Sequence, residues 1–146
     1  KIVIRSSIIG PEQGIGFSLM NWFLNNKESA VSGYKNHMWN GVTTLNFAKI
    51  IEGIINSKIT NFKTHHLTPK NVISKANLLE QFKIHFNKEI EINHLDADSV
   101  INRTLKSNNI NLNEEMWKSA GYNHVPTIEE NIEELANSEF THKIMM

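Results

Sequence analysis

Short extended runs of apolar residues alternate along the chain with longer stretches in which apolar residues recur at helical spacing. The first run, residues 1–9, is apolar nearly throughout and ends at the turn pair Gly10-Pro11, which predicts a buried strand of a parallel sheet. Residues 14–26 then carry several large apolar side chains and predict a helix with a wide apolar face. This alternation is typical of a mixed α/β chain.

Three later helices are marked by residues that can cap a first turn. Thr43 or Thr44 precedes a stripe of apolar residues, and its hydroxyl can accept from a free backbone N–H. Ser74 stands in the same relation to a second stripe, and residues 127–130 form a Thr-x-x-Glu capping box directly after a proline. A shorter helix is predicted around residues 114–120.

Short strands are predicted between these helices, over residues 37–42, 64–68 and 89–95. The resulting order is β-α-β-α-β-α-β-α-α, without an internal repeat or a linker long enough to divide the chain. We therefore expect residues 1–146 to form a single α/β domain with short strands and several helices.

Composition and charge narrow the class of protein. Fifteen basic side chains balance fifteen acidic ones, so we expect no nucleic-acid partner, which would require a basic excess or stripe. No apolar run of membrane-spanning length and no signal peptide are present, so we expect no membrane partner and a cytoplasmic location. Without cysteine there is no thiolate metal site, and the seven histidines show no metal-ligand spacing.

Familiar catalytic motifs are missing from the sequence. Gly10, Gly14 and Gly16 form G-x-x-x-G-x-G rather than the dinucleotide fingerprint G-x-G-x-x-G, which favours a strand-to-helix turn over a phosphate cradle. The pair Ser6-Ser7 lacks the surroundings of a nucleophile elbow. We therefore predict no catalytic residue in this chain.

Three places in the chain carry candidate binding residues. Ser6 and Ser7 end the first strand, where ligand sites form in open α/β sheets, although their hydroxyls can equally be satisfied by their own backbone. Arg103 suits bidentate contact with phosphate, while a surface arginine is the plainer interpretation. Trp39 and Asn40 precede a helix start that can receive an anion, unless Trp39 simply packs.

Four segments also follow a recognisable pattern in the same order. They are Ile4-Arg5-Ser6-Ser7-Ile8-Ile9-Gly10-Pro11-Glu12, Asn40-Gly41-Val42-Thr43-Thr44-Leu45 followed by Phe47-Ala48-Lys49, Asn102-Arg103-Thr104-Leu105, and Ala120-Gly121-Tyr122 followed by Pro126-Thr127-Ile128-Glu129-Glu130. Together they resemble extended short-chain dehydrogenases/reductases of the dTDP-4-dehydrorhamnose reductase-like family. The first segment resembles the strand and turn that follow the family's catalytic Tyr-x-x-x-Lys helix. The resemblance covers essentially the whole chain and implies the C-terminal substrate-binding part of an extended Rossmann-type reductase.

In function, the resemblance implies binding of a nucleotide-activated sugar that the whole enzyme reduces or epimerises with NAD(P)H. Carried over by position, the implied cofactor contacts are Ser6 and Ser7, and the implied substrate-binding residues are Ser7, Gly10, Pro11, Asn40 and Arg103.

The sequence departs from the family pattern in two ways. Ile8 stands where rhamnose-type reductases often carry an aromatic residue, so the resemblance does not fix the sugar. Neither Tyr34 nor Tyr122 has a lysine four residues on, and the glycine-rich loop is absent as well. Because Lys1 opens directly into a strand, we expect the cofactor-binding N-terminal half to lie elsewhere in a longer protein, and we expect no cofactor on this chain alone.

Two further interpretations remain open from the sequence. One is a non-catalytic binding or interaction module that retains the fold. The other is a homo-oligomer that associates through an exposed patch at Trp22, Phe23 and Leu24, although their spacing is more typical of a core.

Overall fold

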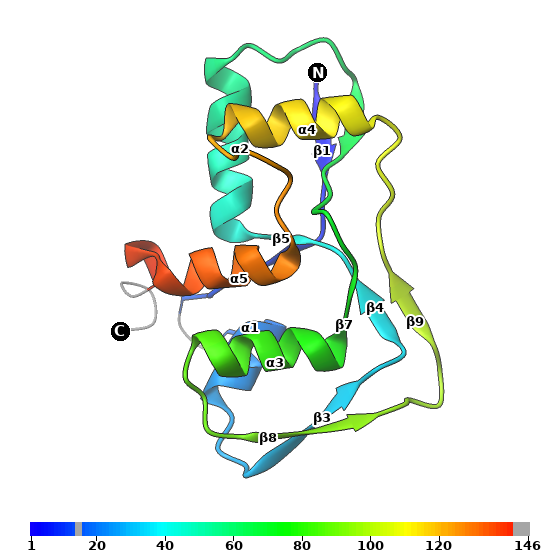
Figure 1. The fold of residues 1–146 in the computed structure, drawn as a ribbon, viewed down its shortest axis with the longest axis vertical. Helices are drawn as coiled ribbons and strands as arrows, with labels where there is room; N and C mark the ends of the chain where they lie inside the picture. The colour runs from blue at the N-terminus through cyan, green and yellow to red at the C-terminus, as the bar shows by residue number, and fades with distance from the viewer. Residues whose placement is uncertain (14–15, 142–146) are drawn as a thin grey trace.

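Short strands in several small sheets lie beside the helices of this chain (Figure 1). The computed structural model describes residues 1–13 and 16–141. None of the helices in these ranges is long and apolar enough to cross a membrane. The helices, in chain order, are α1 Leu19–Asn25, α2 Thr44–Asn56, α3 Lys75–His85, α4 Ile110–Ser119 and α5 Ile128–Asn137.

The first predicted strand is divided into two short pieces. β1 (Val3–Arg5) pairs in parallel with β6 (Thr64–His66), and β2 (Ile8–Ile9) pairs in parallel with β5 (Val42–Thr43). The predicted parallel pairing is confirmed, but the predicted burial is only partial. Ile8 remains 46% exposed, whereas its neighbour Ile9 enters the core.

Two further sheets were only partly predicted. β3 (Ala30–Tyr34) lies parallel to β8 (Glu91–Leu95). β4 (His37–Trp39) is the central strand of the other sheet, antiparallel to β7 (Ile73–Ser74) and parallel to β9 (Ile101–Arg103). The register of β4 and β9 sets Trp39 directly opposite Arg103. Two candidate residues that are distant in sequence thus become neighbours.

Asparagine side chains close both ends of the β4–β9 ladder. The Asn36 carboxamide donates to the Ala97 carbonyl at 2.8 Å and accepts from the Ala97 N–H at 2.9 Å. The Asn40 carboxamide does the same for Leu105, at 2.8 Å and 2.6 Å. Each side chain therefore pairs with one backbone residue as a strand would, and together they hold β9 beside β4.

The helices begin where the capping residues predict. Thr43, Ser74 and Thr127 each accept a hydrogen bond from the backbone N–H three residues on, and Thr127 completes its predicted capping box with Glu130. The helix predicted from Gly14 is shorter, because α1 begins only after its own cap, Ser18. Gly14 itself lies outside the described residues.

Two apolar clusters form the core. One packs α1, α3 and α5 around β3 and β8, and it includes Phe23, Phe82 and Ile132. The other packs α2 against α4 and contains Ile50 and Trp117. Figure 1 shows α5 between the two groups of helices. Because Phe23 is fully buried and Leu24 packs against the first cluster, the residues 22–24 do not form an exposed patch.

Candidate functional site

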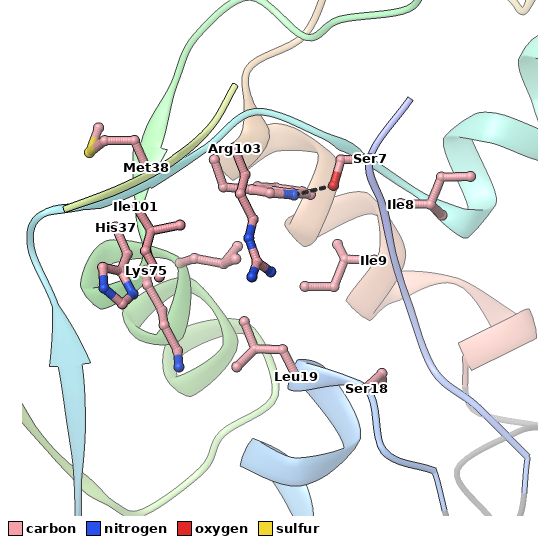
Figure 2. Close-up of a pocket in the computed structure, with 12 residues that line it drawn as sticks. Ser7, Ile8, Ile9, Ser18, Leu19, His37, Met38, Lys75, Ile101 and Arg103 are labelled. Atoms are coloured by element: carbon pink, nitrogen blue, oxygen red, sulfur yellow. Dashed lines mark hydrogen bonds between the residues drawn. The ribbon is translucent and has the colours of Figure 1, made fainter. Parts of the chain in front are cut away.

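A cavity of about 500 Å³ lies where β2, β4, β9 and the first turns of α1 and α3 meet. Trp39 and Arg103 reach it from the carboxyl ends of β4 and β9, and Ser7 reaches it from the segment after β1 (Figure 2). Carboxyl ends of neighbouring strands are where open α/β sheets form their ligand sites. The cavity is therefore the strongest candidate site in the part of the chain that the structure describes.

Two cations enter this cavity without an acidic partner. Its lining contains Lys75 and Arg103 but no aspartate or glutamate, and among the described residues neither cation forms an ion pair. Figure 2 shows both side chains extending into the cavity. Burial, followed by repulsion from Arg103, lowers the pKa of Lys75 below its ordinary value. Two like charges in one partly buried cavity favour an anionic ligand.

Two aromatic rings lie within cation–π distance of the Lys75 ammonium. Its Nζ lies 5.7 Å from the ring centre of Trp22 and 5.4 Å from that of Tyr34. A cation over an aromatic face gains electrostatic attraction without losing its charge to a carboxylate. The charge of Lys75 consequently remains available to the cavity.

The predicted site residues divide into two groups. Ser7 and Arg103 line the cavity together. Ser6, by contrast, donates its hydroxyl to the Leu67 carbonyl at 3.1 Å, and the Asn40 carboxamide is occupied by Leu105. Gly10 and Pro11 lie outside the lining as well. Ligand contacts at all of these residues stay predictions.

Sequence reasoning did not single out Lys75 or His37, which also line the cavity. Lys75 did carry a signal, because it is the first residue of α3. The positive end of the helix dipole disfavours a cation in the first turn, so a lysine there indicates a use other than helix stability. No comparable signal marks His37.

In the turn between β2 and α1, Gly10 packs against protein rather than forming part of a phosphate cradle. A Cβ on Gly10 would overlap the Thr44 hydroxyl, so this glycine allows close packing against the start of α2 rather than an approach to a ligand. Gly14, the middle glycine of the motif, lies outside the described residues. Within the described ranges, no group of three or more histidine, aspartate or glutamate side chains is placed to hold a metal ion.

Solved structures of sugar-nucleotide enzymes share this fold. The chain resembles dTDP-4-dehydrorhamnose reductase from Clostridium acetobutylicum at 13% identity and a TM-score of 0.64, covering 92% of this chain and 47% of that one. It also resembles the Bacillus anthracis reductase in complex with NADP at 13% identity and a TM-score of 0.67, covering 92% and 46%. UDP-N-acetylglucosamine 4-epimerase from Methanobrevibacter ruminantium aligns at 14% identity with a TM-score of 0.59, covering 92% and 44%.

These similarities establish the fold of the chain. It is mixed α/β and matches the C-terminal half of Rossmann-type sugar-nucleotide reductases and epimerases. The chain spans about half the length of the structures it matches. No protein-family model and no curated protein matches the sequence.

Proposed function

We propose that this chain is the substrate-binding part of an NAD(P)-dependent reductase or epimerase that acts on a nucleotide-activated deoxysugar. The observation that carries the proposal is the cavity in which Arg103 and Lys75 converge without a carboxylate. A nucleotide diphosphate supplies the anionic charge that these cations lack, and its sugar needs the smaller polar and apolar groups of the same cavity, which include Ser7, Ile9 and Leu19.

The ligands of similar structures support this assignment. The Bacillus anthracis reductase was solved with NADP, and the Methanobrevibacter ruminantium epimerase with UDP-N-acetylmuramic acid. The order of the four sequence segments agrees with the same class of enzyme. The dTDP-4-dehydrorhamnose reductase-like substrate, rather than another sugar nucleotide, is the finer part of the proposal.

The proposed partner is a cofactor-binding half that adds to β1. Among the described strands, β1 pairs with β6 alone, so the backbone groups of Ile4 face an edge without a neighbour. Parallel sheets are normally larger and covered on both faces, and a two-stranded one is marginal by itself. A further parallel strand, supplied with the NAD(P)-binding half, would complete this sheet.

Arg103→Ala tests the proposal in the complete encoded protein. Loss of a charge-assisted contact should weaken dTDP-glucose binding by roughly 1.5–3 kcal/mol, which is about 10- to 150-fold by calorimetry. Lys118→Ala is the matched control, because Lys118 is an exposed cation on α4 outside the cavity lining. Unchanged affinity in Arg103→Ala would show that Arg103 does not bind the ligand and would overturn the proposed site.

A further inference from the structure

One hydrogen bond inside the cavity orients a hydroxyl. The Trp39 indole N–H donates to the Ser7 hydroxyl oxygen at 2.6 Å, shown as the dashed line in Figure 2. An indole N–H can only donate, so the serine must be the acceptor, and one of its two lone pairs is used. Among the described residues the Ser7 hydroxyl donates to no protein acceptor. Its proton is therefore free for a ligand.

The backbone around Ser7 and Trp39 restricts where these two side chains can lie. The Ser7 carbonyl accepts from the Val42 N–H at 2.9 Å, which ties Ser7 to β5. A Cβ on Gly41 would overlap both the Ser7 carbonyl and the Trp39 ring, so only glycine lets the indole lie where it does. Hydrogen bonding and packing with the segment from Trp39 to Val42 thus fix the position of the Ser7 hydroxyl.

The residues around Ser7 suit two different kinds of ligand group, one charged and one uncharged. Arg103 stands opposite Trp39 and carries positive charge, whereas Ile9 and Leu19 add apolar surface to the same cavity. Figure 2 shows Ser7 and Arg103 side by side at the cavity wall. An anionic group of the ligand therefore suits Arg103, and the Ser7 hydroxyl is left to donate to an uncharged acceptor.

We propose that Trp39 is a positioning residue that fixes Ser7 as a hydrogen-bond donor to a neutral oxygen on the sugar of the bound nucleotide. This proposal rests on the proposed function for the ligand, but its geometric part does not. A donor held ready on a partly apolar wall rejects a ligand without a matching acceptor, because the donor is then desolvated without a partner. Trp39 therefore contributes to the choice of sugar without contacting it.

The test compares dTDP-glucose with dTDP on the complete encoded protein, using Ser7→Ala, Trp39→Phe and the double variant. Each single change should weaken dTDP-glucose binding about fivefold and leave dTDP binding unchanged, as expected for one neutral hydrogen bond. The double variant should lose no more than Ser7→Ala, because Trp39 acts through Ser7. Ser29→Ala is the matched control, since Ser29 is exposed and lies outside the lining.

A ligand-free measurement distinguishes the two proposals. In the NMR spectrum, Ser7→Ala should shift the Trp39 indole N–H signal and speed its exchange, while the Trp22 signal stays in place. An unmoved Trp39 signal would overturn the positioning role whatever the protein binds. Equal losses for dTDP and dTDP-glucose, or additive losses in the double variant, would also overturn it. If the signal shifts but neither probe binds, the proposed function fails and the ligand role of Ser7 fails with it.

Discussion

Asn40 shows how one side chain can hold a candidate site together through its contacts with the backbone. It is 5% exposed, and its carboxamide satisfies both backbone groups of Leu105, two residues after Arg103. The resemblance implies that Asn40 lies near the nucleotide. That proximity stays a prediction, whereas the structure shows that Asn40 fixes the segment directly after the strand that carries Arg103.

Asn40→Ala should therefore lower stability as well as binding. Two hydrogen bonds are lost and the Leu105 N–H and carbonyl are left without partners, which costs about 1–3 kcal/mol. Urea unfolding followed by circular dichroism measures this loss. Asn108→Ala, at an exposed position, should change the free energy of unfolding little. Equal free energies of unfolding for Asn40→Ala and Asn108→Ala would show that the hydrogen bonds between Asn40 and Leu105 contribute nothing to stability.

His65 gives the chain a pH-dependent stability. It is only 4% exposed, and its ring lies 3.4 Å from the Asn113 side-chain oxygen. Burial lowers the pKa of His65 below 6.5 in the folded chain, more than the Asn113 contact raises it. As the pH falls below about 6.5, the unfolded chain binds a proton that the folded chain does not, so the free energy of unfolding decreases.

Replacing His65 should make the free energy of unfolding less dependent on pH. In His65→Gln the fall in unfolding free energy between about pH 7 and pH 5 should be smaller than in the parent chain, as measured by urea titrations at each pH. His85→Gln is the matched control, because His85 lies on α3 and is not among the groups that shift the pKa of His65. If the two variants have the same pH slope as the parent, His65 is not responsible.

At the scale of elements, a polar cluster connects α2 with α5. The Glu134 carboxylate accepts from Lys49 at 2.6 Å, from the Tyr122 hydroxyl at 2.7 Å and from Asn46 at 3.0 Å. Burial alone would lower the pKa of Lys49, but its contacts with Glu134 and Tyr122 raise it overall. Burial, reinforced by Glu134, also raises the pKa of Tyr122. The cluster thus joins elements from the two apolar clusters through one carboxylate.

Glu134→Gln should weaken this connection by about 1 kcal/mol, which is less than the roughly 1.5–3 kcal/mol usual for a hydrogen bond to a charged group, because solvent screens a partly exposed pair. Denaturant unfolding of Glu134→Gln, Lys49→Met and the double variant gives the coupling between the two residues. Glu133→Gln, one position along the same helix and exposed, serves as the control. Strictly additive losses would mean that Lys49 and Glu134 do not act together.

Local signals in the sequence predicted the elements that are determined locally. The capping positions Thr43, Ser74 and Thr127 were correct, because a cap depends on residues three positions apart. β3, β7 and β9 were missed. β3 exists through its pairing with β8, and β7 and β9, which are only two and three residues long, exist through pairing with β4. For the same reason Ser7 and Arg103 could be nominated from sequence, whereas their meeting in one cavity required the tertiary fold.

For the whole molecule, the candidate site depends on the order of the entire chain. Its lining comes from five well-separated segments, which include Ser7, Leu19, Trp39, Lys75 and Arg103. The β2–β5 sheet and the β7–β4–β9 sheet meet at this cavity, and the side chains of Asn36 and Asn40 hold β9 in place. A change that loosens either apolar cluster should therefore affect binding at a distance, whereas no single loop can supply the site by itself.

The 146-residue chain should bind NAD(P)H negligibly while retaining affinity for dTDP-glucose. Gly10, in the β2–α1 turn, is packed against Thr44, so among the described residues of this turn Gly10 offers no approach for a dinucleotide phosphate. The cavity with Arg103 and Lys75 does not depend on such a cradle. Titration of NADH and NADPH followed by their fluorescence checks the first expectation, and calorimetry with dTDP-glucose on the same preparation checks the second. Tight, saturable NAD(P)H binding would show that the cofactor site lies in this chain and would overturn the assignment of cofactor binding to a separate half.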